Sequence, residues 1–485
     1  MGTMVQTSVQ TSVSGGAADE PSAGAGVAQR TVHVVSLGCP KNRVDTELMV
    51  GGLQAAGLHL VAEADGADVL LVNTCAFIEA SKVESVDAIL ELAEVKARNP
   101  GSRLVVAGCL SQRHAPELRQ EMPEVDLFVG TGEYQQILQA LGFEPGGAAM
   151  AGAVSGAASF ADGSRKGKPT YIADHLQPRW IAPGSISTWL KIAEGCSQGC
   201  SFCIIPKLRG KQRSRSVEDC VAEARRLVEG GTVEICLVAQ DLTHYGEDIG
   251  QPDALAALVR GLGQVDGLRW VRLMYAYPHN FTDSLVAAMA ESPNCVPYVD
   301  MPLQHCSDNV LQRMNRRTSR AEMEGLLLRL RAAMPDITLR TTLLVGHPGE
   351  TEDDFASLLD FVKHWRFDHM GAFAYSSEDG TASARMTDPV PEAVKAWRHK
   401  TLLQAQRRIA RARNQARVGQ RLEVLVHGLS AETDLLLEGR HRGQAPEIDG
   451  VVYINDAPDD IGRGQLRTVE ITEAHDYDLV GHVVA

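Results

Sequence analysis

Three cysteines lie close together in the segment WLKIAEGCSQGCSFCIIPKLRG, where Cys196, Cys200 and Cys203 have the spacing CxxxCxxC. Three thiolates in one tight loop can hold three irons of a cubane iron–sulfur cluster and leave the fourth iron open. Zinc is the competing use of such thiolates. Structural zinc usually takes four protein ligands from two paired modules, and no such partner module lies nearby in the sequence. The spacing therefore favours an iron–sulfur cluster with an open iron.

Three other cysteines are far apart in the sequence but share one position relative to β-rich runs. Cys39 follows such a run in LGCPKN, Cys75 follows the next in NTCAF, and Cys109 follows the third in AGCLSQ. Parallel strands end at the same edge of a sheet, where open α/β folds place their ligands, so these thiols can converge. The alternative is three independent buried cysteines. The repeated placement favours a second site of three thiols, which also suits an iron–sulfur cluster.

The elements that would position these spread cysteines alternate between strand and helix over residues 31–142. Runs rich in β-branched and apolar residues predict strands at 33–37, 68–73, 103–108 and 126–130. Helical patterns lie between them, near 43–56, 79–97 and 114–121. This alternation predicts an N-terminal α/β domain with a parallel sheet.

Six more units of strand and helix follow over residues 186–416. Their strands are predicted at 187–193, 233–240, 268–276, 298–304, 337–345 and 369–375. Six such units form an open, partial (β/α)6 barrel, in which chemistry takes place at the C-terminal ends of the strands. The loop that contains Cys196, Cys200 and Cys203 follows the first strand, as that rule requires.

The composition is that of a globular protein of several domains. The chain has 485 residues, of which 44% are hydrophobic and 22% charged, and its 47 basic and 61 acidic residues give a net charge of −14. This charge argues against binding nucleic acid through bulk charge and leaves only a local basic patch for that purpose. No run of about 18 apolar residues occurs and the N-terminus has no apolar segment, so we expect neither a membrane span nor a signal peptide.

These features predict a cytoplasmic, reducing compartment, in which the ten cysteines are not expected to form disulfides. Four cysteines outside the two candidate sites stand singly in apolar patterns or at a strand end. We expect these four to be buried in the core, as free cysteines commonly are. They are Cys220, Cys236, Cys295 and Cys306.

Three changes in composition divide the chain. Residues 1–30 are small and polar, with few large apolar side chains, and are expected to form a disordered tail. Residues 143–185 are again small and polar, then interrupted by prolines, and predict an interdomain linker. A basic helical pattern near 392–416 is best explained as an amphipathic closing helix. After it, short alternating strands over residues 417–485 predict a small C-terminal β domain.

The CxxxCxxC loop, with Phe202 directly before its last cysteine, resembles the radical S-adenosylmethionine superfamily, which packs adenine against an aromatic residue at that position. Residues 31–484 as a whole resemble the methylthiotransferases, which join an N-terminal domain with three spread cysteines, a radical S-adenosylmethionine barrel and a small β-barrel of the TRAM type. The resemblance implies S-adenosylmethionine and two [4Fe–4S] clusters. Their ligands would be Cys39, Cys75 and Cys109 for one cluster and Cys196, Cys200 and Cys203 for the other.

The resemblance also implies contacts to S-adenosylmethionine. In LLVGHPGE, Gly346 and Gly349 lie just past the fifth strand and Glu350 begins a helix, which is similar to the superfamily's glycine-rich turn against the adenosyl group. Without the resemblance this turn would be weak evidence, because glycine at a strand end is more often a simple turn. Gln240 and Asp241 end the second strand and could bond the amino or ribose groups of the cofactor.

Several segments resemble the branch of the methylthiotransferases that modifies an aspartate of ribosomal protein S12, free or in the small subunit. They are IAEGCSQGCSFCIIPKLRGKQRSR, MPLQHCSDNVL, LRTTLLVGHPGETEDDF, YSSEDGTASA and APEIDGVVYI. The branch that modifies adenosine in tRNA is the alternative. A non-catalytic iron–sulfur carrier is an alternative of another class, but it would not need a six-unit barrel with a cofactor turn.

The resemblance implies that one-electron reduction cleaves S-adenosylmethionine to a 5′-deoxyadenosyl radical, which takes hydrogen from the β-carbon of the target aspartate. The open iron of the N-terminal cluster would hold the sulfur, and a second S-adenosylmethionine would supply the methyl group. The product would be 3-methylthioaspartate. Such an enzyme needs a sulfur donor and a reductant such as flavodoxin or ferredoxin.

The charge of the C-terminal domain gives partly independent support for a protein substrate. Residues 417–485 contain six arginines, no lysine and thirteen acidic residues, a net charge of −7. Such a domain disfavours phosphate and attracts a cationic ribosomal protein, unless the charges only solvate the domain. In APEIDG, before the strand that starts at VVYI, Glu447 and Asp449 are expected at the binding edge.

Four more residues are candidates for contact with the substrate. A basic run after the cluster loop contains Arg209 and Arg213, either of which could hold a carboxylate by bidentate pairing. The alternative for this run is a solvated strand or loop. Gln304 ends the fourth strand of the barrel and Tyr375 ends the sixth, so both are expected to line the pocket.

Overall fold

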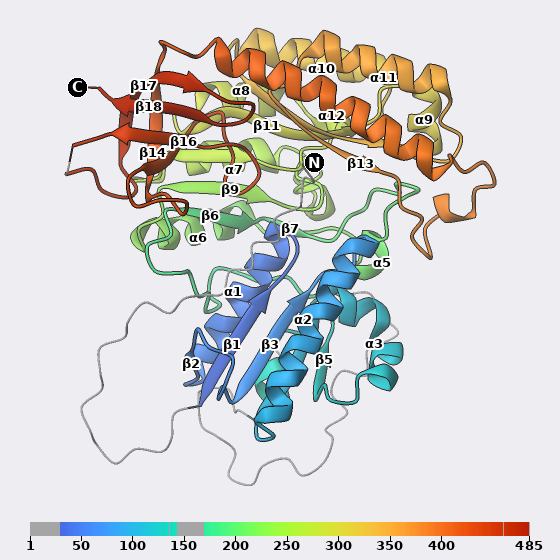
Figure 1. Cartoon of the computed structure of the whole chain (residues 1–485), viewed down its shortest axis with the longest axis vertical. Helices are drawn as coiled ribbons and strands as arrows, with labels where there is room; N and C mark the ends of the chain where they lie inside the picture. The colour runs from blue at the N-terminus through green and yellow to red at the C-terminus, as the bar shows by residue number, and fades with distance from the viewer. Residues whose placement is uncertain (1–29, 135, 143–168, 459, 485) are drawn as a thin grey trace. The chain divides into compact units, whose positions relative to one another are not determined.

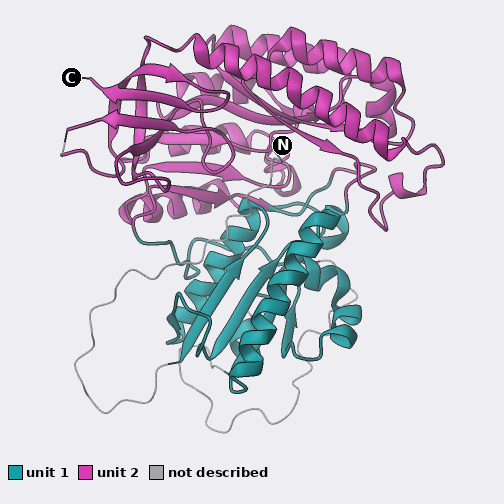
Figure 2. Ribbon diagram, viewed as in Figure 1, with its two compact units in different colours: residues 1–183, 194–197, 204–213 teal, residues 184–193, 198–203, 214–485 magenta. Residues whose placement is uncertain are grey.

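The computed structural model describes residues 30–134, 136–142, 169–458 and 460–484, and it folds as two compact units (Figure 2). Unit 1 is the chain up to Pro183 together with residues 194–197 and 204–213, and unit 2 is the rest. The expected tail 1–30 lies outside the described residues apart from Arg30, and so does the first part of the expected linker, residues 143–168.

The sheet of unit 1 has five parallel strands in the order β2-β1-β3-β4-β5 (Figure 1). The strands are β1 (Thr31–Ser36), β2 (His59–Leu60), β3 (Val69–Thr74), β4 (Arg103–Gly108) and β5 (Leu127–Val129). The helices are α1 (Pro40–Ala55), α2 (Glu79–Arg98), α3 (Cys109–Glu121), α4 (Gln136–Ala140) and the short α5 (Ile205–Leu208). The structure therefore confirms the predicted parallel α/β domain. The sequence pattern missed β2, because two residues are too few to show an alternation.

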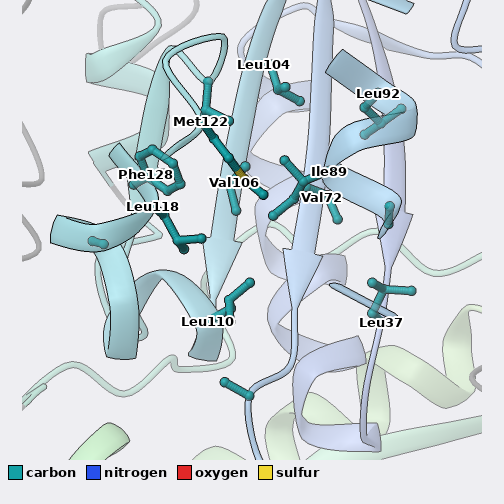
Figure 3. Close-up of a cluster of buried hydrophobic side chains, with 14 of the residues drawn as sticks. Leu37, Val72, Ile89, Leu92, Leu104, Val106, Leu110, Leu118, Met122 and Phe128 are labelled. Atoms are coloured by element: carbon teal, nitrogen blue, oxygen red, sulfur yellow. The ribbon is translucent and has the colours of Figure 1, made fainter. Parts of the chain in front are cut away.

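Both faces of this sheet are buried, as is usual for parallel sheets. On one face, Val72 and Val106 pack against Ile89 of α2 and Leu118 of α3 (Figure 3). On the other face, apolar side chains of the strands pack against α1, for example Leu53. The strands are thus held rigidly in register, which fixes where each of them ends.

The described part of the expected linker, residues 169–183, packs on unit 1. The backbone N–H of Trp180 donates to the carbonyl of Glu47 in α1 at 2.9 Å. The guanidinium of Arg179 pairs with the Glu47 carboxylate at 2.6 Å. Tyr171 and Trp180 also contact the apolar core, so this segment is part of the N-terminal unit.

The main sheet of unit 2 is an open row of six parallel strands that follow one another in chain order, as predicted for a partial (β/α)6 barrel. The strands are β6 (Ser187–Lys191), β9 (Glu234–Val238), β10 (Trp270–Leu273), β11 (Cys295–Gln304), β12 (Thr338–Val345) and β13 (His369–Ala374). The helices around it are α6 (Val217–Glu229), α7 (Ala254–Leu262), α8 (Asp283–Glu291), α9 (Asp308–Arg313), α10 (Arg320–Ala333) and α11 (Glu352–Trp365). Two short strands, β7 (Ala193–Glu194) and β8 (Arg213–Ser214), flank the cluster loop in the sequence.

The long helix α12 (Glu392–Gln415) leads to a closed five-stranded barrel in the order β14-β15-β16-β18-β17. Its strands are β14 (Arg421–Leu429), β15 (Leu437–His441), β16 (Val452–Asp456), β17 (Leu466–Ala474) and β18 (Leu479–Val483), drawn in red in Figure 1. Val424, Val452 and Ile471 are among the aliphatic residues that fill it. Closure leaves no free strand edges, which stabilises so small a β domain.

Buried charges join this closed barrel to the open sheet within unit 2. Arg440 of β15 pairs with Glu234 at the first position of β9, and Arg272 of β10 binds the same carboxylate at 3.0 Å. Arg440 also donates to the hydroxyl of Ser187, the first residue of β6, at 2.9 Å. The partners of Arg440 lie at the N-terminal ends of β6 and β9, and in barrels of this kind these ends serve stability and not chemistry.

None of the helices in the described ranges combines the length and the apolar character needed to pass through a lipid bilayer.

Candidate functional site

The strands of unit 1 bring their cysteines to one edge of the sheet. Ser36 of β1 is in register with Asn73 of β3, and Thr74 of β3 with Gly108 of β4. Cys39 then caps the start of α1, Cys75 follows β3, and Cys109 begins α3. Strand ends in register therefore place the three thiols at the same edge, as predicted from the sequence.

Asn42 and Gly38 hold this edge together. The side-chain amide of Asn42 donates to the carbonyls of Leu37 and Thr74, at 3.1 and 2.9 Å. Gly38 has φ of +91°, and a Cβ there would lie 3.3 Å from the Cys75 Sγ. Only glycine fits this position without moving the thiol.

Arg209, which the sequence suggested as a substrate contact, is fully buried in unit 1. One of its terminal nitrogens, Nη1, contacts the carboxylates of Asp45 at 3.1 Å and Glu194 at 2.9 Å. The other, Nη2, donates to the side-chain oxygen of Asn42. This corrects the prediction, because both terminal nitrogens already serve residues that position the thiol edge.

The three thiols lie in one electrostatic environment. Burial alone would raise the pKa of Cys39, but the positive charges of Lys41 and Arg209 outweigh it and hold the pKa below the ordinary value. Burial raises the pKa of Cys75 to about 12, and the neighbouring Cys109 and Cys39 add to this rise. Burial also raises the pKa of Cys109, while Arg209 opposes the rise. Each thiol thus responds to charges on its neighbours.

Backbone and side-chain contacts hold the cluster loop that follows β6. In unit 1, the N–H of Cys196 donates to the carbonyl of Gly210 at 3.1 Å, and a Cβ on Gly195 would lie 2.3 Å from the carbonyl of Lys211. In unit 2, the side chain of Gln198 donates to Asp241 at 2.9 Å. Cys200 and Cys203 are half-buried, and the N–H of Cys203 donates to the carbonyl of Cys200 at 3.2 Å.

Within the described residues, no group of three or more His, Cys, Asp or Glu side chains is arranged to hold a metal ion in this conformation. The chemistry of the donor sets nevertheless fits iron–sulfur clusters, since each set consists of three free thiols. The four remaining cysteines, Cys220, Cys236, Cys295 and Cys306, are all buried.

The glycine-rich turn after β12 is shaped by Glu350. The buried carboxylate of Glu350 accepts from the N–H groups of Gly346 and His347 and pairs with Arg398 at 3.0 Å. Burial raises the pKa of Glu350 to about 7, although Arg398 favours the charged form. The oxygens of Glu350 thus bind the turn itself, and its contact with the cofactor stays a prediction. Gly346 and Gly349 have φ of +79° and +80°, as such a turn requires.

His347 connects the turn to the cluster loop, and the sequence reasoning missed this role. Its Nε2 lies 3.1 Å from the hydroxyl of Ser201, a residue that lies between Cys200 and Cys203 in the sequence. Its ring makes edge contacts with Phe202 and Tyr375, at centroid distances of 6.5 and 5.4 Å. Phe202 and Tyr375 also share one apolar cluster. The structure thus brings together two predicted residues from distant segments.

The other residues predicted at strand ends also lie there. Gln240 and Asp241 follow β9, and the Asp241 carboxylate accepts from Gln198 and, at 2.9 Å, from Thr243. Asp241 therefore anchors the cluster loop. Gln304 is the last residue of β11 and has φ of +70°, a left-handed conformation that is costly for a side chain other than glycine.

Three candidate substrate residues have structural partners. The guanidinium of Arg213 donates to backbone carbonyls, among them that of Lys211 at 2.8 Å. Asp449 was expected at the binding edge, but its side chain is 1% exposed, accepts from Tyr298 at 2.8 Å and pairs with Arg340 at 3.4 Å. That placement was wrong, because the carboxylate neutralises buried positive charge. Glu447 is exposed, and its place at a binding edge stays a prediction.

Three family models match the chain in succession. The uncharacterized protein family UPF0004 matches residues 31–130, the radical SAM superfamily residues 190–362 and the TRAM domain residues 418–484. Three curated relatives named ribosomal protein uS12 methylthiotransferase RimO each cover 94% of the chain. The relative from Anaeromyxobacter sp. (strain K) is 51% identical with 93% of its own length covered, that from Myxococcus xanthus 49% with 92%, and that from Trichlorobacter lovleyi 47% with 99%.

The chain belongs to the RimO family of methylthiotransferases.

Solved structures agree with this family at the level of the fold. The radical S-adenosylmethionine methyltransferase TsrM from Kitasatospora setae, with cobalamin and a [4Fe–4S] cluster bound, has a TM-score of 0.50 at 16% identity and covers 71% of this chain and 72% of its own. The same enzyme with tryptophan and a cofactor analogue has a TM-score of 0.51 at 13% identity, covering 71% and 73%. As a member of the RimO family, the chain is a radical S-adenosylmethionine transferase that uses an iron–sulfur cluster.

Proposed function

We propose that this protein methylthiolates the β-carbon of an aspartate of ribosomal protein S12 and forms 3-methylthioaspartate. The observation that carries the proposal is the identity of 44–51% to proteins named uS12 methylthiotransferases, over at least 93% of the chain. A match over this share of the chain extends across all three successive domains.

We assign two [4Fe–4S] clusters to the six cysteines. Cys39, Cys75 and Cys109 would hold one cluster in the domain 31–142, and Cys196, Cys200 and Cys203 would hold the other in the domain 186–416. When bound, the second cluster and S-adenosylmethionine supply the abstraction of a hydrogen atom from an unactivated carbon. The first cluster is assigned to sulfur delivery, which requires a sulfur donor, and the reaction requires a reductant such as flavodoxin or ferredoxin.

The protein's own side chains position the reactants. Asp241 holds the cluster loop through Gln198, and His347 ties the same loop to the glycine-rich turn. Glu350 fixes the backbone of that turn by accepting hydrogen bonds from two of its N–H groups. Phe202 and Tyr375 add apolar surface beside His347 of the turn, and such surface excludes water from a reactive carbon centre. We propose that Gly346 and Gly349 give the adenosyl group its close approach to the backbone.

The surface of the C-terminal barrel supports a cationic protein as substrate. Among its described residues, the buried side chains of Arg440 and Asp449 carry opposite charges and pair with partners in the open sheet. The exposed acids of the described part are Glu423, Glu432, Asp434, Glu447, Asp456, Asp460 and Glu473. Such a surface attracts a basic ribosomal protein and repels the phosphates of tRNA.

Reconstitution with purified substrates tests the proposal. Full-length protein with iron, sulfide, S-adenosylmethionine and a reductant is incubated with S12, with S12 in which the target aspartate is changed to alanine, or with tRNA. We expect modification of S12 alone, and none of the alanine variant. Methylthioadenosine in tRNA with unmodified S12 would replace the substrate assignment, and intact S-adenosylmethionine in every reaction would favour a non-catalytic carrier.

The ligand assignment has a separate readout. We expect about eight irons per chain in the wild-type protein and about four when either set of three cysteines is changed to alanine. Changing Cys220 and Cys236, which are buried outside both sets, is the matched control and should leave the iron content unchanged. Retention of all iron after loss of either set would contradict the assignment.

A further inference from the structure

Residues 314–316, directly after α9, contact residues 199–201 of the cluster loop. The carbonyl of Met314 accepts from the N–H of Ser201 at 2.9 Å, and the side chain of Asn315 donates to the carbonyl of Gly199 at 2.7 Å. Between these two contacts, Nη1 of Arg316 lies 3.8 Å from the Sγ of Cys200. The segment Met314–Arg316 therefore fixes the middle of the loop, and it places a cation against one of the thiols.

The guanidinium of Arg316 is itself held in a fixed position. It stacks over the ring of Tyr277, with its central carbon 4.1 Å from the ring centroid. Its Nη2 donates to the carbonyl of Pro302 at 2.6 Å. Arg316 is 8% exposed, and its Nε has no hydrogen-bond partner among the described residues.

The positive charge of Arg316 is not neutralised locally. Among the described residues, no carboxylate forms an ion pair with this guanidinium, whereas other buried arginines of unit 2, such as Arg272 and Arg398, are paired with glutamates. A buried, unpaired cation is costly in free energy, and the polarisable sulfur of Cys200 is the negative group it faces once deprotonated. The sequence gives no sign of this role, because Arg316 lies in the short connection between α9 and α10, far in sequence from the cysteines.

We propose that Arg316 sets the reduction potential of the cluster at Cys196, Cys200 and Cys203. The inference rests on the proposed ligand assignment. One-electron reduction adds a negative charge to the cluster, and a fixed cation with an N–H directed at a ligand sulfur stabilises the reduced form more than the oxidised form. The low dielectric of a buried site strengthens this effect. Arg316 is thus a positioning residue that raises the potential by acting through Cys200.

A redox titration followed by electron paramagnetic resonance tests this role. The full-length chain carries alanine at Cys39, Cys75 and Cys109, so that the resonance signal comes only from the cluster at Cys196, Cys200 and Cys203. In this background Arg316→Gln removes the buried charge, Arg316→Lys keeps it, and Arg317→Gln removes an exposed charge one residue further on. We expect a clearly lower midpoint potential for Arg316→Gln, and potentials near that of the background chain for Arg316→Lys and Arg317→Gln.

Several results would overturn the proposal. The potential of Arg316→Gln could equal that of the background chain with its iron intact, or Arg317→Gln could shift as far, which would indicate net charge alone. If Arg316→Gln loses its iron, Arg316→Met replaces it, since methionine keeps an apolar chain over Tyr277. Loss of iron from both neutral variants would show a merely structural role. A background chain without iron would instead contradict the ligand assignment itself, so the two failures are distinguishable.

Discussion

Buried polar side chains determine the geometry of both cysteine sites at the scale of single residues. Arg209, Asn42 and Glu350 do not offer free groups to a substrate; they bind the backbone or the acids next to the thiols and the turn. Buried polar groups are costly unless they are hydrogen-bonded, so each of them defines one arrangement of its surroundings. The positions of the thiols and of the glycine-rich turn are therefore fixed by these bonds.

Substitution of His347 by phenylalanine should weaken the binding of S-adenosylmethionine about 5-fold, the equivalent of one net hydrogen bond of about 1 kcal/mol. Phenylalanine keeps the ring contacts with Phe202 and Tyr375 but loses the bond to Ser201. Equilibrium dialysis of the reconstituted protein measures the effect. His364→Phe, at an exposed position of α11, is the control and should bind normally. Unchanged binding of S-adenosylmethionine by His347→Phe would show that the bond between His347 and Ser201 does not support the cofactor site.

At the scale of elements, two neighbouring strands of the open sheet end in an unusual backbone conformation. Gln304, the last residue of β11, and Gly346, directly after β12, both have positive φ. Strain of this kind persists only where the surrounding packing imposes it, and it gathers at functional edges. The opposite edge, in contrast, is closed by ion pairs with the C-terminal barrel.

Gly346→Ala should destabilise the protein by about 1–3 kcal/mol, because alanine disfavours the left-handed conformation and has no room there. Its Cβ would lie 2.4 Å from the Cγ of the buried Lys395. Gly325→Ala is the matched control, since Gly325 lies in α10 with nothing within 4 Å of its added Cβ. Alanine there should be neutral or stabilising by up to about 1 kcal/mol. Chemical denaturation compares the two, and equal effects would refute the strained turn.

Glu234→Gln tests the contact between β9 and β15 through its dependence on pH. Burial alone would raise the pKa of Glu234, but Arg440 and Arg272 lower it from 4.5 to about 2. Because the pKa of Glu234 is lower in the folded than in the unfolded protein, the charged carboxylate stabilises the fold at pH values above the unfolded pKa of 4.5. This contribution, about 3 kcal/mol, is lost as the pH falls from 4.5 toward 2. We expect the variant to lose about 3–5 kcal/mol at neutral pH and to show a flatter fall in stability below pH about 4.5.

The exposed Glu229→Gln serves as the control for that experiment, measured by denaturant unfolding at several pH values. It should retain both the stability and the pH dependence of the wild-type protein. A Glu234→Gln variant with the full wild-type slope would show that this ion pair does not link the two elements.

At the scale of the molecule, the acidic barrel and the cluster loop lie at different ends of the open sheet in unit 2. The barrel is joined to the N-terminal ends of β6 and β9, whereas the loop follows the C-terminal end of β6. A substrate that uses both must therefore reach across the sheet. If the substrate docks on the barrel as proposed, docking raises the local concentration of the target residue at the other end.

This arrangement predicts that intact S12 is a better substrate than a short peptide containing its target aspartate. We expect kcat/KM to be at least about 10-fold higher for intact S12 at low ionic strength, because charge attraction speeds association, and to fall with added salt. The peptide should show little dependence on salt. Initial rates at a series of salt concentrations measure both, and equal rates for the two substrates would contradict a docking role.

Much of this architecture could be predicted from the sequence, because apolar periodicity marks strands directly. The strand predicted at 103–108 coincides with β4, while that predicted at 233–240 starts one residue before β9 and ends two residues beyond it. The burial of Arg209 could not be predicted. Its partners Asp45 and Glu194 are distant in the sequence, and only the fold brings them together.

The central claim is the modification of S12, and mass spectrometry of S12 from cells with and without the gene tests it most directly. We predict a gain of about 46 Da, the mass of an added SCH₂ unit, on one aspartate-containing peptide, and its loss on deletion. Restoration by the wild-type gene, but not by a gene with alanine at Cys196, Cys200 and Cys203, would tie the gain to the cluster loop. An S12 mass that is the same with and without the gene would contradict the account.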